Sequence, residues 1–252
     1  MIRVGVGGWT YEPWRGVFYP PGLRQADELK HASRALTAIE INGTFYGSQK
    51  PESYRKWHDE TPDSFKFSLK GPRFAVNRRV LADAGESIAR FFTTGMDRLG
   101  DKLGPILWQF AATKQFDRDD MAAFISLLPA KLGDRRLQHA LEVRHESFRD
   151  PAFLALARDA NACAVFAHAD KYPTPLDAGD DPTADFVYAR LQNCIETEPT
   201  GYPVAALDGW AAQARNWGAG GIRDVYVYFI SGAKIRAPAA AQTLIGRLAE
   251  PG

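Results

Sequence analysis

Cysteine is scarce in this sequence: Cys163 and Cys194 are the only two among 252 residues. Two cysteines cannot build the disulfide framework of a small secreted domain, and neither lies in a metal-binding spacing, so we expect buried thiols. The sequence also lacks the HExxH motif, the P-loop, the GxGxxG fingerprint and the GxSxG elbow. It therefore carries no signature of a zinc peptidase, a P-loop nucleotide hydrolase, a Rossmann dehydrogenase or a serine hydrolase.

An excess of one charge sign is absent as well, since 31 lysines and arginines face 30 acidic residues and the formal net charge is +1. This balance argues against non-specific coating of nucleic acid, although a local basic patch would still allow such a partner. No run of about 18 apolar residues occurs, so we expect no membrane contact. The chain passes from Met1 directly into a strand pattern without a signal peptide, which predicts a cytoplasmic protein.

Residues 141–146 (LEVRHE) show the pattern from which we predict the fold. Successive side chains of a strand point to opposite faces, so Leu141 and Val143 face one way while Glu142 and Arg144 face the other. One apolar face and one charged face are unusual for an ordinary core strand. They are typical of a closed barrel, whose strands pack on helices outside and enclose a lumen inside.

Strand-like and helical segments alternate along the whole chain. We expect eight strands, at residues 3–8, 38–42, 65–70, 106–110, 141–146, 163–170, 186–192 and 225–229. We expect helices at residues 27–36, 52–60, 83–99, 118–128, 152–160, 207–217 and 239–248. This alternation implies parallel strands with right-handed crossovers, and eight such units in 252 residues predict an α/β fold of one (β/α)₈ barrel of the TIM type.

The segment between the sixth and seventh expected strands breaks this regularity. Residues 171–185 carry three prolines and no helical pattern, so we expect an irregular connection there. The sequence contains no linker, tandem repeat or low-complexity stretch. We therefore predict a single TIM-type barrel domain over residues 1–252, and nothing in the sequence indicates an oligomeric state.

Polar side chains gather at the C-terminal ends of the expected strands, where TIM barrels carry their active sites. Burying an unpaired charge costs several kcal/mol, so this set either forms a closed network of ion pairs or opens to solvent and a ligand. The residues that the alternation places inside the upper lumen are Glu40, Asn42, Lys70, Gln109, Glu142, Arg144, His168, Asp170, Arg190 and Tyr228.

The residue types in this set suit the binding of an anion. Arg144 and Arg190 offer paired donors for a carboxylate or a phosphate, and Lys70 adds a positive charge, or a base if burial lowers its pKa. Glu142 and Glu40 would transfer protons if their surroundings separate their pKa values. His145 would assist as a catalytic residue, or else act as a capping or solvent-exposed histidine, and His168 is a further candidate for proton transfer. The other polar residues assigned to ligand binding are Asn42, Gln109, Asp170 and Tyr228.

Aromatic residues are dense in the first two loops that follow strands. Trp9, Tyr11 and Tyr46 are predicted to bind ligand there by stacking on a sugar or a base, or alternatively to cover the barrel mouth as an aromatic plug. The whole aromatic group comprises Trp9, Tyr11, Trp14, Phe18, Tyr19, Phe45 and Tyr46.

A divalent cation is weakly indicated. Its oxygen and imidazole ligands would be Glu40, Glu142, His168 and Asp170. No HxH or HExxH spacing supports this set, and the nearby arginines would oppose a cation. We therefore assign no metal ligands, and the sequence identifies no cofactor.

Four stretches together resemble the YecE-like family, known as domain of unknown function 72. They are residues 8–20 (GWTYEPWRGVFYP), 40–46 (EINGTFY), 141–145 (LEVRH), and the pair 187–191 (VYARL) with 225–229 (VYVYF). They follow the family order from the first strand to the last. The resemblance implies a TIM-type barrel and no established activity. The polar positions that match the family are Glu40, Asn42, Gln109, Glu142, Arg144, His145 and Arg190.

This sequence departs from the family pattern at three places. Gln192-Asn193 stand where the family has His-Gly, and residues 230–232 (ISG) stand where it has Asn-Asn-Asp. Residues 111–112 are Ala-Ala instead of Pro-Pro. The resemblance therefore implies a divergent member whose chemistry at the ends of the last two strands is altered or lost.

Three hypotheses for function follow. The first is an enzyme, a hydrolase or a lyase, that binds a small anionic or phosphate-bearing molecule at the C-terminal barrel face. The second is a barrel that binds a ligand without chemistry, which the altered strand ends favour. The third is a protein that processes nucleic acid, with a nucleotide held at the barrel mouth by aromatics and arginines.

Overall fold

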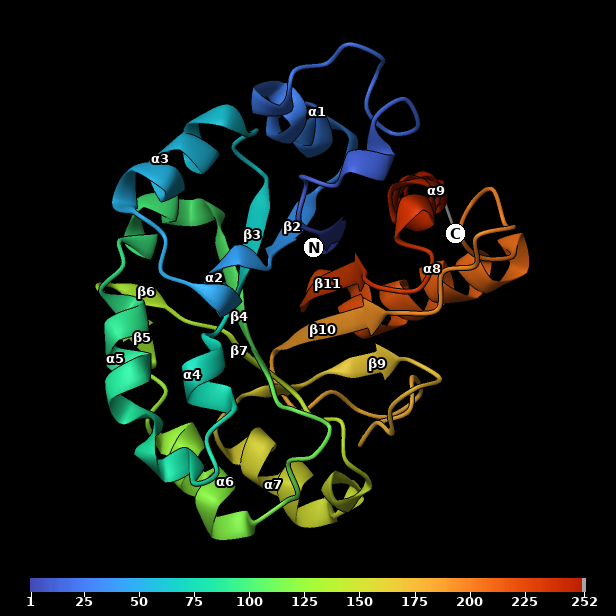
Figure 1. Cartoon of the computed structure of the whole chain (residues 1–252). Coiled ribbons are helices and arrows are strands. Elements are labelled where there is room, and N and C mark those ends of the chain that lie inside the picture. The colour runs from blue at the N-terminus through green and yellow to red at the C-terminus, as the bar shows by residue number, and fades with distance from the viewer. Residues whose placement is uncertain (251–252) are drawn as a thin grey trace.

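The computed structural model describes residues 1–250, and in them nine parallel strands form one sheet that curls into a ring. Helices surround this ring on its outside (Figure 1). The strand order is β8 (Cys163–Ala164), β7 (His139–Glu142), β4 (Leu103–Gln109), β3 (Lys66–Lys70), β2 (Ala38–Ile41), β1 (Ile2–Gly7), β11 (Asp224–Phe229), β10 (Phe186–Leu191) and β9 (Phe166–His168). The predicted TIM-type barrel is confirmed. A separate antiparallel hairpin joins β5 (Lys131–Leu132) and β6 (Arg135–Arg136).

The strand count differs from the predicted eight, because the expected sixth strand is divided. β8 and β9 are separated in the chain by Val165 alone. β8 pairs with β7, whereas β9 pairs with β10, so the two halves belong to opposite ends of the sheet. β8 and β9 are thus the first and last strands of the sheet order, and the chain that connects them through Val165 closes the ring.

Each expected helix has a counterpart, although one of them is divided and the short helices at residues 43–46 and 73–76 were not expected. The expected helix at residues 83–99 is divided, because α5 ends at Phe92 and Gly95, with a left-handed φ of 92°, turns the chain before the 3-10 helix Met96–Lys102. The helices of the described chain are α1 (Glu28–Ala35), α2 (Gly43–Tyr46), α3 (Pro51–Glu60), α4 (Arg73–Val76), α5 (Gly85–Phe92), α6 (Arg118–Ser126), α7 (Pro151–Asp159), α8 (Val204–Gly218) and α9 (Ala237–Ala249), with short 3-10 helices that include Glu12–Trp14 and Met96–Lys102. Within residues 1–250, none of them is long and apolar enough to cross a membrane.

Local sequence signals explain where several helices start. Asp117 and Asp150 each accept a hydrogen bond from a backbone N–H of the following first turn, which caps α6 and α7. Pro51 and Pro151 occupy the first turn of α3 and α7, where the missing N–H of proline has no consequence. The segment between β9 and β10 is irregular as expected, since residues 169–185 form neither helix nor strand.

The sheet separates two apolar clusters. The outer cluster lies between strands and helices and includes Val4, Ile39 and Val227. The inner cluster fills the lumen and includes Leu107, Phe186, Tyr188, Tyr226 and Tyr228. Alternation therefore holds as predicted along the strands other than the sixth, but the expected strand at residues 141–146 is shifted, because β7 ends at Glu142 and residues 143–146 lie beyond it. The lower lumen is packed with side chains, and polar groups occupy its upper end.

The sixth strand breaks the predicted orientation. Cys163 and Val165 face the lumen, whereas Phe166 packs on Trp217 of α8 with ring centroids 4.8 Å apart. His168 faces the same way, with its ring 5.2 Å from that of Trp210. The prediction that placed His168 and Asp170 in the lumen was wrong, because the large apolar side chain of Phe166 fills the space under α8 and sets the parity of the strand.

Candidate functional site

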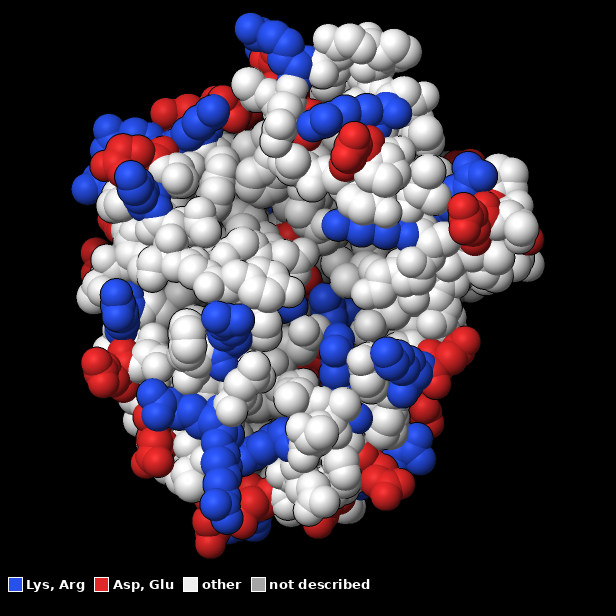
Figure 2. All heavy atoms as spheres, in the orientation of Figure 1, with Lys and Arg blue, Asp and Glu red and all other residues white. Residues whose placement is uncertain are grey.

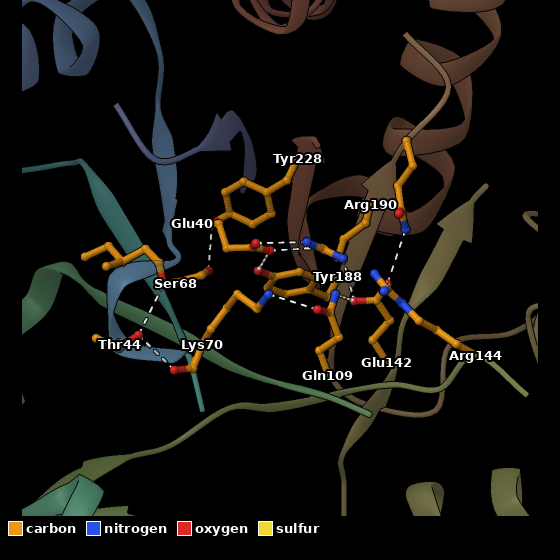
Figure 3. A network of polar contacts seen from close by, with 12 residues as sticks. Glu40, Thr44, Ser68, Lys70, Gln109, Glu142, Arg144, Tyr188, Arg190 and Tyr228 are labelled. Atoms are coloured by element: carbon orange, nitrogen blue, oxygen red, sulfur yellow. Dashed lines mark hydrogen bonds and ion pairs between the residues drawn. The ribbon is translucent and has the colours of Figure 1, made fainter. Parts of the chain in front are cut away.

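Arg190 lies at the centre of a buried ion network in the upper lumen (Figure 3). Its guanidinium donates hydrogen bonds of 3.0 Å from Nε and from Nη2 to Glu40, and one of 2.5 Å from Nη1 to Glu142. The Arg190 side chain is 2% exposed, and the two carboxylates are as deeply buried. The three residues belong to β10, β2 and β7, so the network connects strands that lie far apart around the ring.

Glu142 is also held by three neighbouring side chains. Arg144 donates to Oε1 at 3.0 Å from Nη2, and Gln192 donates to the same oxygen at 3.2 Å. Gln109 donates to Oε2 at 2.6 Å. Burial by itself would raise the pKa of Glu142, but Arg190 and Arg144 outweigh it and lower this pKa to about 2.

Glu40 is similarly engaged. Besides the two bonds from Arg190, it accepts one of 2.8 Å from the Tyr188 hydroxyl. Burial would lower the pKa of Arg190, but Glu142 and Glu40 raise it above its ordinary value. The geometry of both glutamates is that of the closed ion-pair network considered from the sequence, and a carboxyl group with a pKa near 2 is a poor base at neutral pH.

A cavity of about 300 Å³ lies at the C-terminal ends of the strands, next to this network. Four of its lining residues are lysine or arginine, and none of those that the structure describes is acidic. The hollow is visible near the middle of the face in Figure 2, with basic side chains on its wall. The two glutamates of the network offset half of this charge, so the mouth keeps an excess of positive charge. Its lining residues are Gly7, Trp14, Asn42, Lys70, Gln109, Arg144, Arg190, Phe229, Ile230, Ser231 and Lys234.

Lys70 occupies one wall of the cavity, at the last position of β3. Its side chain is buried, and its Nζ donates a hydrogen bond of 2.9 Å to Oε1 of Gln109. The Nζ also lies 4.5 Å from the centre of the Phe45 ring. The pKa of Lys70 is lowered to about 8, and burial is the largest cause; Glu40 and Glu142 oppose this shift, whereas Arg190 and Arg144 act in the same direction as burial.

The opposite wall comes from the N-terminal loop and the segment after β11. The Trp14 indole is buried and donates a hydrogen bond of 2.8 Å to the carbonyl of Lys234. The ammonium of Lys234 lies 4.5 Å from the centre of the Tyr11 ring, and burial lowers its pKa. Ile230 and Ser231 complete this wall. The loop therefore contributes a rigid aromatic support for a second lysine.

The structure brings Lys70, Asn42, Gln109, Arg144 and Arg190 to the cavity wall. Glu142 lies directly behind the wall in hydrogen-bond contact with Gln109 and Arg144. Most of the predicted polar site is therefore assembled in one place, although Glu40 and Glu142 do not themselves line the cavity.

Other predicted residues lie elsewhere. The Nδ1 of His145 accepts from the backbone N–H of Ser147, which makes it the cap of a short 3-10 helix and not part of the cavity wall. Asp170 is exposed and pairs with Asn193 at 2.8 Å. Tyr228 is buried in the lumen, where its hydroxyl lies 2.7 Å from Oγ of Ser68.

The three aromatic residues predicted to bind ligand also separate. Trp9 packs against Trp57 of α3, with ring centroids 5.3 Å apart, in the layer outside the barrel. Tyr11 supports Lys234 from behind. Tyr46 is 65% exposed in a neighbouring groove. Aromatic residues close to each other in sequence thus face three different surroundings.

Sequence reasoning missed Lys234, Tyr188 and Gln192. Tyr188 and Gln192 have the same parity as Arg190 on the seventh predicted strand, which was a usable signal for both. Lys234 lies five residues past the end of β11 in a loop, where no periodicity indicates direction. The sequence places Trp14 among the loop aromatics but does not indicate that it lines the site.

The four residues considered for a divalent cation are not assembled. Glu40 and Glu142 share Arg190 inside the lumen, whereas His168 faces α8 and Asp170 is exposed beyond the end of β9. Among residues 1–250, no group of three or more His, Cys, Asp or Glu side chains has the arrangement of a metal site.

A second groove, of about 410 Å³, lies beside the cavity between α2, α4 and α5. Phe45 lies in its wall and also contacts Lys70, so the groove and the cavity are neighbours. Tyr46 and Phe74 are 65% and 62% exposed there. Arginines surround them, and basic side chains gather over α4 in Figure 2. A local basic and aromatic patch therefore exists despite the balanced net charge.

A family model described as "Protein of unknown function DUF72" matches residues 3–252. The chain belongs to the DUF72 family. The protein YecE of Escherichia coli K12 is 27% identical to it over 148 residues, which cover 59% of this chain and 50% of YecE. YunF of Bacillus subtilis is 25% identical over 158 residues, which cover 61% of this chain and 54% of YunF. The chain thus spans about half the length of the curated relatives it matches.

Solved structures of DUF72 proteins have the same fold. A family member from Thermotoga maritima superposes with a TM-score of 0.79 and 21% identity, covering 99% of this chain and 100% of that one. A member from Enterococcus faecalis gives a TM-score of 0.77 and 17% identity, covering 100% of this chain and 97% of that one. At these identities the likeness shows the fold alone.

Two departures from the DUF72 pattern fall at the site itself. Gln192 stands where the resemblance leads to a histidine, and its amide donates to Glu142. Ile230 stands where it leads to an asparagine, and its side chain lines the cavity. The wall near the end of β11 is consequently less polar here than the family pattern implies.

Proposed function

We propose that this DUF72 protein is an enzyme of the hydrolase or lyase class that binds a small anionic molecule, carrying a carboxylate or a phosphate, in the cavity at the barrel mouth. The observation that carries this proposal is the excess of basic over acidic groups around the cavity. Because both glutamates of the network are already shared with Arg190, the remaining positive charge is available to a ligand.

Specific donors in the cavity support the proposal. In the described part of the chain, Nη1 of Arg144 and Nζ of Lys234 have no hydrogen-bond partner. Lys70 donates to Gln109 and retains further N–H groups. The N–H groups of Arg190 are directed at Glu40 and Glu142, so Arg190 acts mainly by positioning the network.

The size of the cavity limits the ligand. Its volume of about 300 Å³ is at the lower end of the range of about 300–1,000 Å³ that small-molecule sites occupy. The ligand that fits is a small metabolite, with the anionic group near Arg144 and Lys234. Trp14 and Ile230 offer apolar contact for the rest of the molecule.

Calorimetric titration with inorganic phosphate and with pyruvate tests the proposal. The wild-type protein is expected to bind at least one of these anions, and Arg144→Ala is expected to weaken binding by at least about tenfold, the usual loss for a charged hydrogen bond. The matched control is Arg149→Ala, because Arg149 is exposed and does not line the cavity. Equal affinity of wild type and Arg144→Ala would refute the proposal.

The same protein preparations separate the alternatives. A ligand that is retained in native mass spectrometry, together with no turnover across a panel of phosphate esters and 2-oxo acids, would favour a binding barrel without chemistry. Binding of a single-stranded oligonucleotide that weakens steeply with salt, and that Phe74→Ala reduces, would favour a nucleic-acid function for the second groove.

A further inference from the structure

Lys70 is a buried lysine without a carboxylate partner at salt-bridge distance in the described chain, which is unfavourable for a residue that only supplies positive charge. Its ammonium group is buried in the cavity wall, and its hydrogen-bond partner is the neutral amide oxygen of Gln109. Within residues 1–250, no carboxylate lies at salt-bridge distance from it. Arg144 and Arg190 line the same cavity, so Lys70 has positively charged neighbours.

We propose that Lys70 forms an imine with the carbonyl carbon of a small anionic substrate, a 2-oxo acid or a phosphorylated aldehyde or ketone. This inference rests on the proposed function, because the anionic group of the substrate has to be held in the same cavity. It narrows the reaction class to a lyase that uses a lysine as the nucleophile.

The placement of the charged groups suits a substrate with two functional groups. Arg144 and Lys234 line the cavity, and in the described chain Nη1 of Arg144 and Nζ of Lys234 have no hydrogen-bond partner, so they can hold the carboxylate or phosphate. Lys70 comes from a different strand and lines the same cavity. A carbonyl group next to the bound anion would then face the amine, which is the orientation that nucleophilic attack requires.

The step balances without an added oxidant or reductant. The lone pair of the neutral amine forms a bond to the carbonyl carbon, and the carbonyl oxygen takes up the two amine protons and leaves as water. Protonation of the resulting imine gives a cation that accepts the electron pair of a neighbouring carbon–carbon bond. A lyase uses this electron sink to break such a bond.

Burial in the cavity wall favours the neutral form of Lys70. The charged groups that act on it are Glu40 on β2, Glu142 on β7, Arg190 on β10 and Arg144 after β7. Burial lowers its pKa to about 8, so a substantial fraction of the amine is unprotonated in mildly alkaline solution. The reactive form is therefore accessible without a separate base.

Lys66 provides a matched comparison on the same strand. It shares the parity of Lys70 on β3, and burial lowers its pKa as well. However, its ammonium donates to the carbonyl of Asp101 at the other end of the barrel and does not line the cavity. If a lowered pKa were sufficient for imine formation, both lysines would react with the carbonyl compound. If the amine must also face the cavity, Lys70 alone will react.

Trapping with sodium borohydride tests the inference. Full-length protein is incubated with pyruvate, glyoxylate or dihydroxyacetone phosphate, reduced, and examined by intact and peptide mass spectrometry. Reduction of an imine adds the mass of the carbonyl compound less one oxygen atom. We expect one adduct on Lys70 with at least one of the three probes, unchanged trapping in Lys66→Arg, and more than tenfold less in Lys70→Arg.

Two further measurements make the outcome decisive. The yield of adduct should rise with pH around a midpoint of about 8, because the neutral amine is the nucleophile. The circular dichroism spectrum of Lys70→Arg should match that of the wild type, which shows that the variant is folded, and calorimetry on the wild type measures binding of the probes. Binding of the probes without any Lys70 adduct would overturn the imine and leave the proposed function standing. Absence of binding as well would overturn both.

Discussion

Replacing Glu142 by glutamine is expected to destabilise the fold, because this change removes the charge and keeps the volume of the side chain. Lowering the pKa of a carboxyl group from 4.5 to about 2 corresponds to about 3 kcal/mol of preference for the ionised form, at about 1.4 kcal/mol per pH unit. Breaking a buried ion pair by removing one partner costs about 3–5 kcal/mol, which agrees with this value. Glu142→Gln should therefore lower the free energy of unfolding by about 3 kcal/mol near pH 7.

The dependence on pH gives the sign of the effect. The folded-state pKa of Glu142 is depressed, so its contribution is fully present above 4.5 and is lost as the pH falls through about 2. Urea unfolding curves for wild type and Glu142→Gln should consequently converge between these pH values, with the difference about half as large near pH 3.

An exposed neighbour serves as the control. Glu146→Gln changes the same charge four residues away on an exposed side chain, and should alter stability by less than about 0.5 kcal/mol. If Glu142→Gln were as mild as this control, or if its effect were the same near pH 7 and near pH 3, the assignment of Glu142 as an ionised partner of two arginines would be refuted.

The remaining predictions concern packing. Gly5→Ala should lower the free energy of unfolding by more than about 3 kcal/mol in urea titrations, because the new Cβ would lie 1.9 Å from the backbone oxygen of Ala38. The control Gly209→Ala, at an open position of α8, should be neutral or stabilising. Equal stabilities of the two variants would contradict the tight contact between β1 and β2. Cys163 and Cys194 are buried, and burial raises the pKa of each thiol to about 12. A disulfide reagent near pH 8 should therefore modify these cysteines only after the protein unfolds. Rapid modification of the native protein would contradict this prediction.

Period-two alternation made the barrel and much of its polar interior predictable. Glu40, Glu142 and Arg190 each occupy the lumen parity of a strand whose other face is apolar, and this pattern is visible in the sequence. The pairing among them was not visible, because it depends on which strands face each other across the ring. Periodicity therefore does not distinguish a closed ion network from an open site, because that distinction depends on contacts across the barrel.

Two kinds of error came from features that periodicity does not describe. Lys234 and Trp14 reach the cavity from loops, and the direction of a loop side chain is set by tertiary contacts such as the indole bond to the Lys234 carbonyl. Alternation groups His168 and Asp170 with Phe166 on one face of the sixth strand, and the prediction assigned that face to the lumen, whereas Phe166 packs it on α8. The large apolar side chain of Phe166 indicates the orientation of that strand better than its polar residues do.

The position of Arg190 restricts how molecules reach the cavity. Its guanidinium spans the lumen between Glu40 and Glu142, and the aromatic side chains of the inner cluster, such as Tyr188, Tyr226 and Tyr228, fill the barrel interior. The cavity therefore has a closed floor, and whatever occupies it enters and departs through the same opening. For the enzyme that we propose, a product would have to diffuse out before the next substrate could take its place.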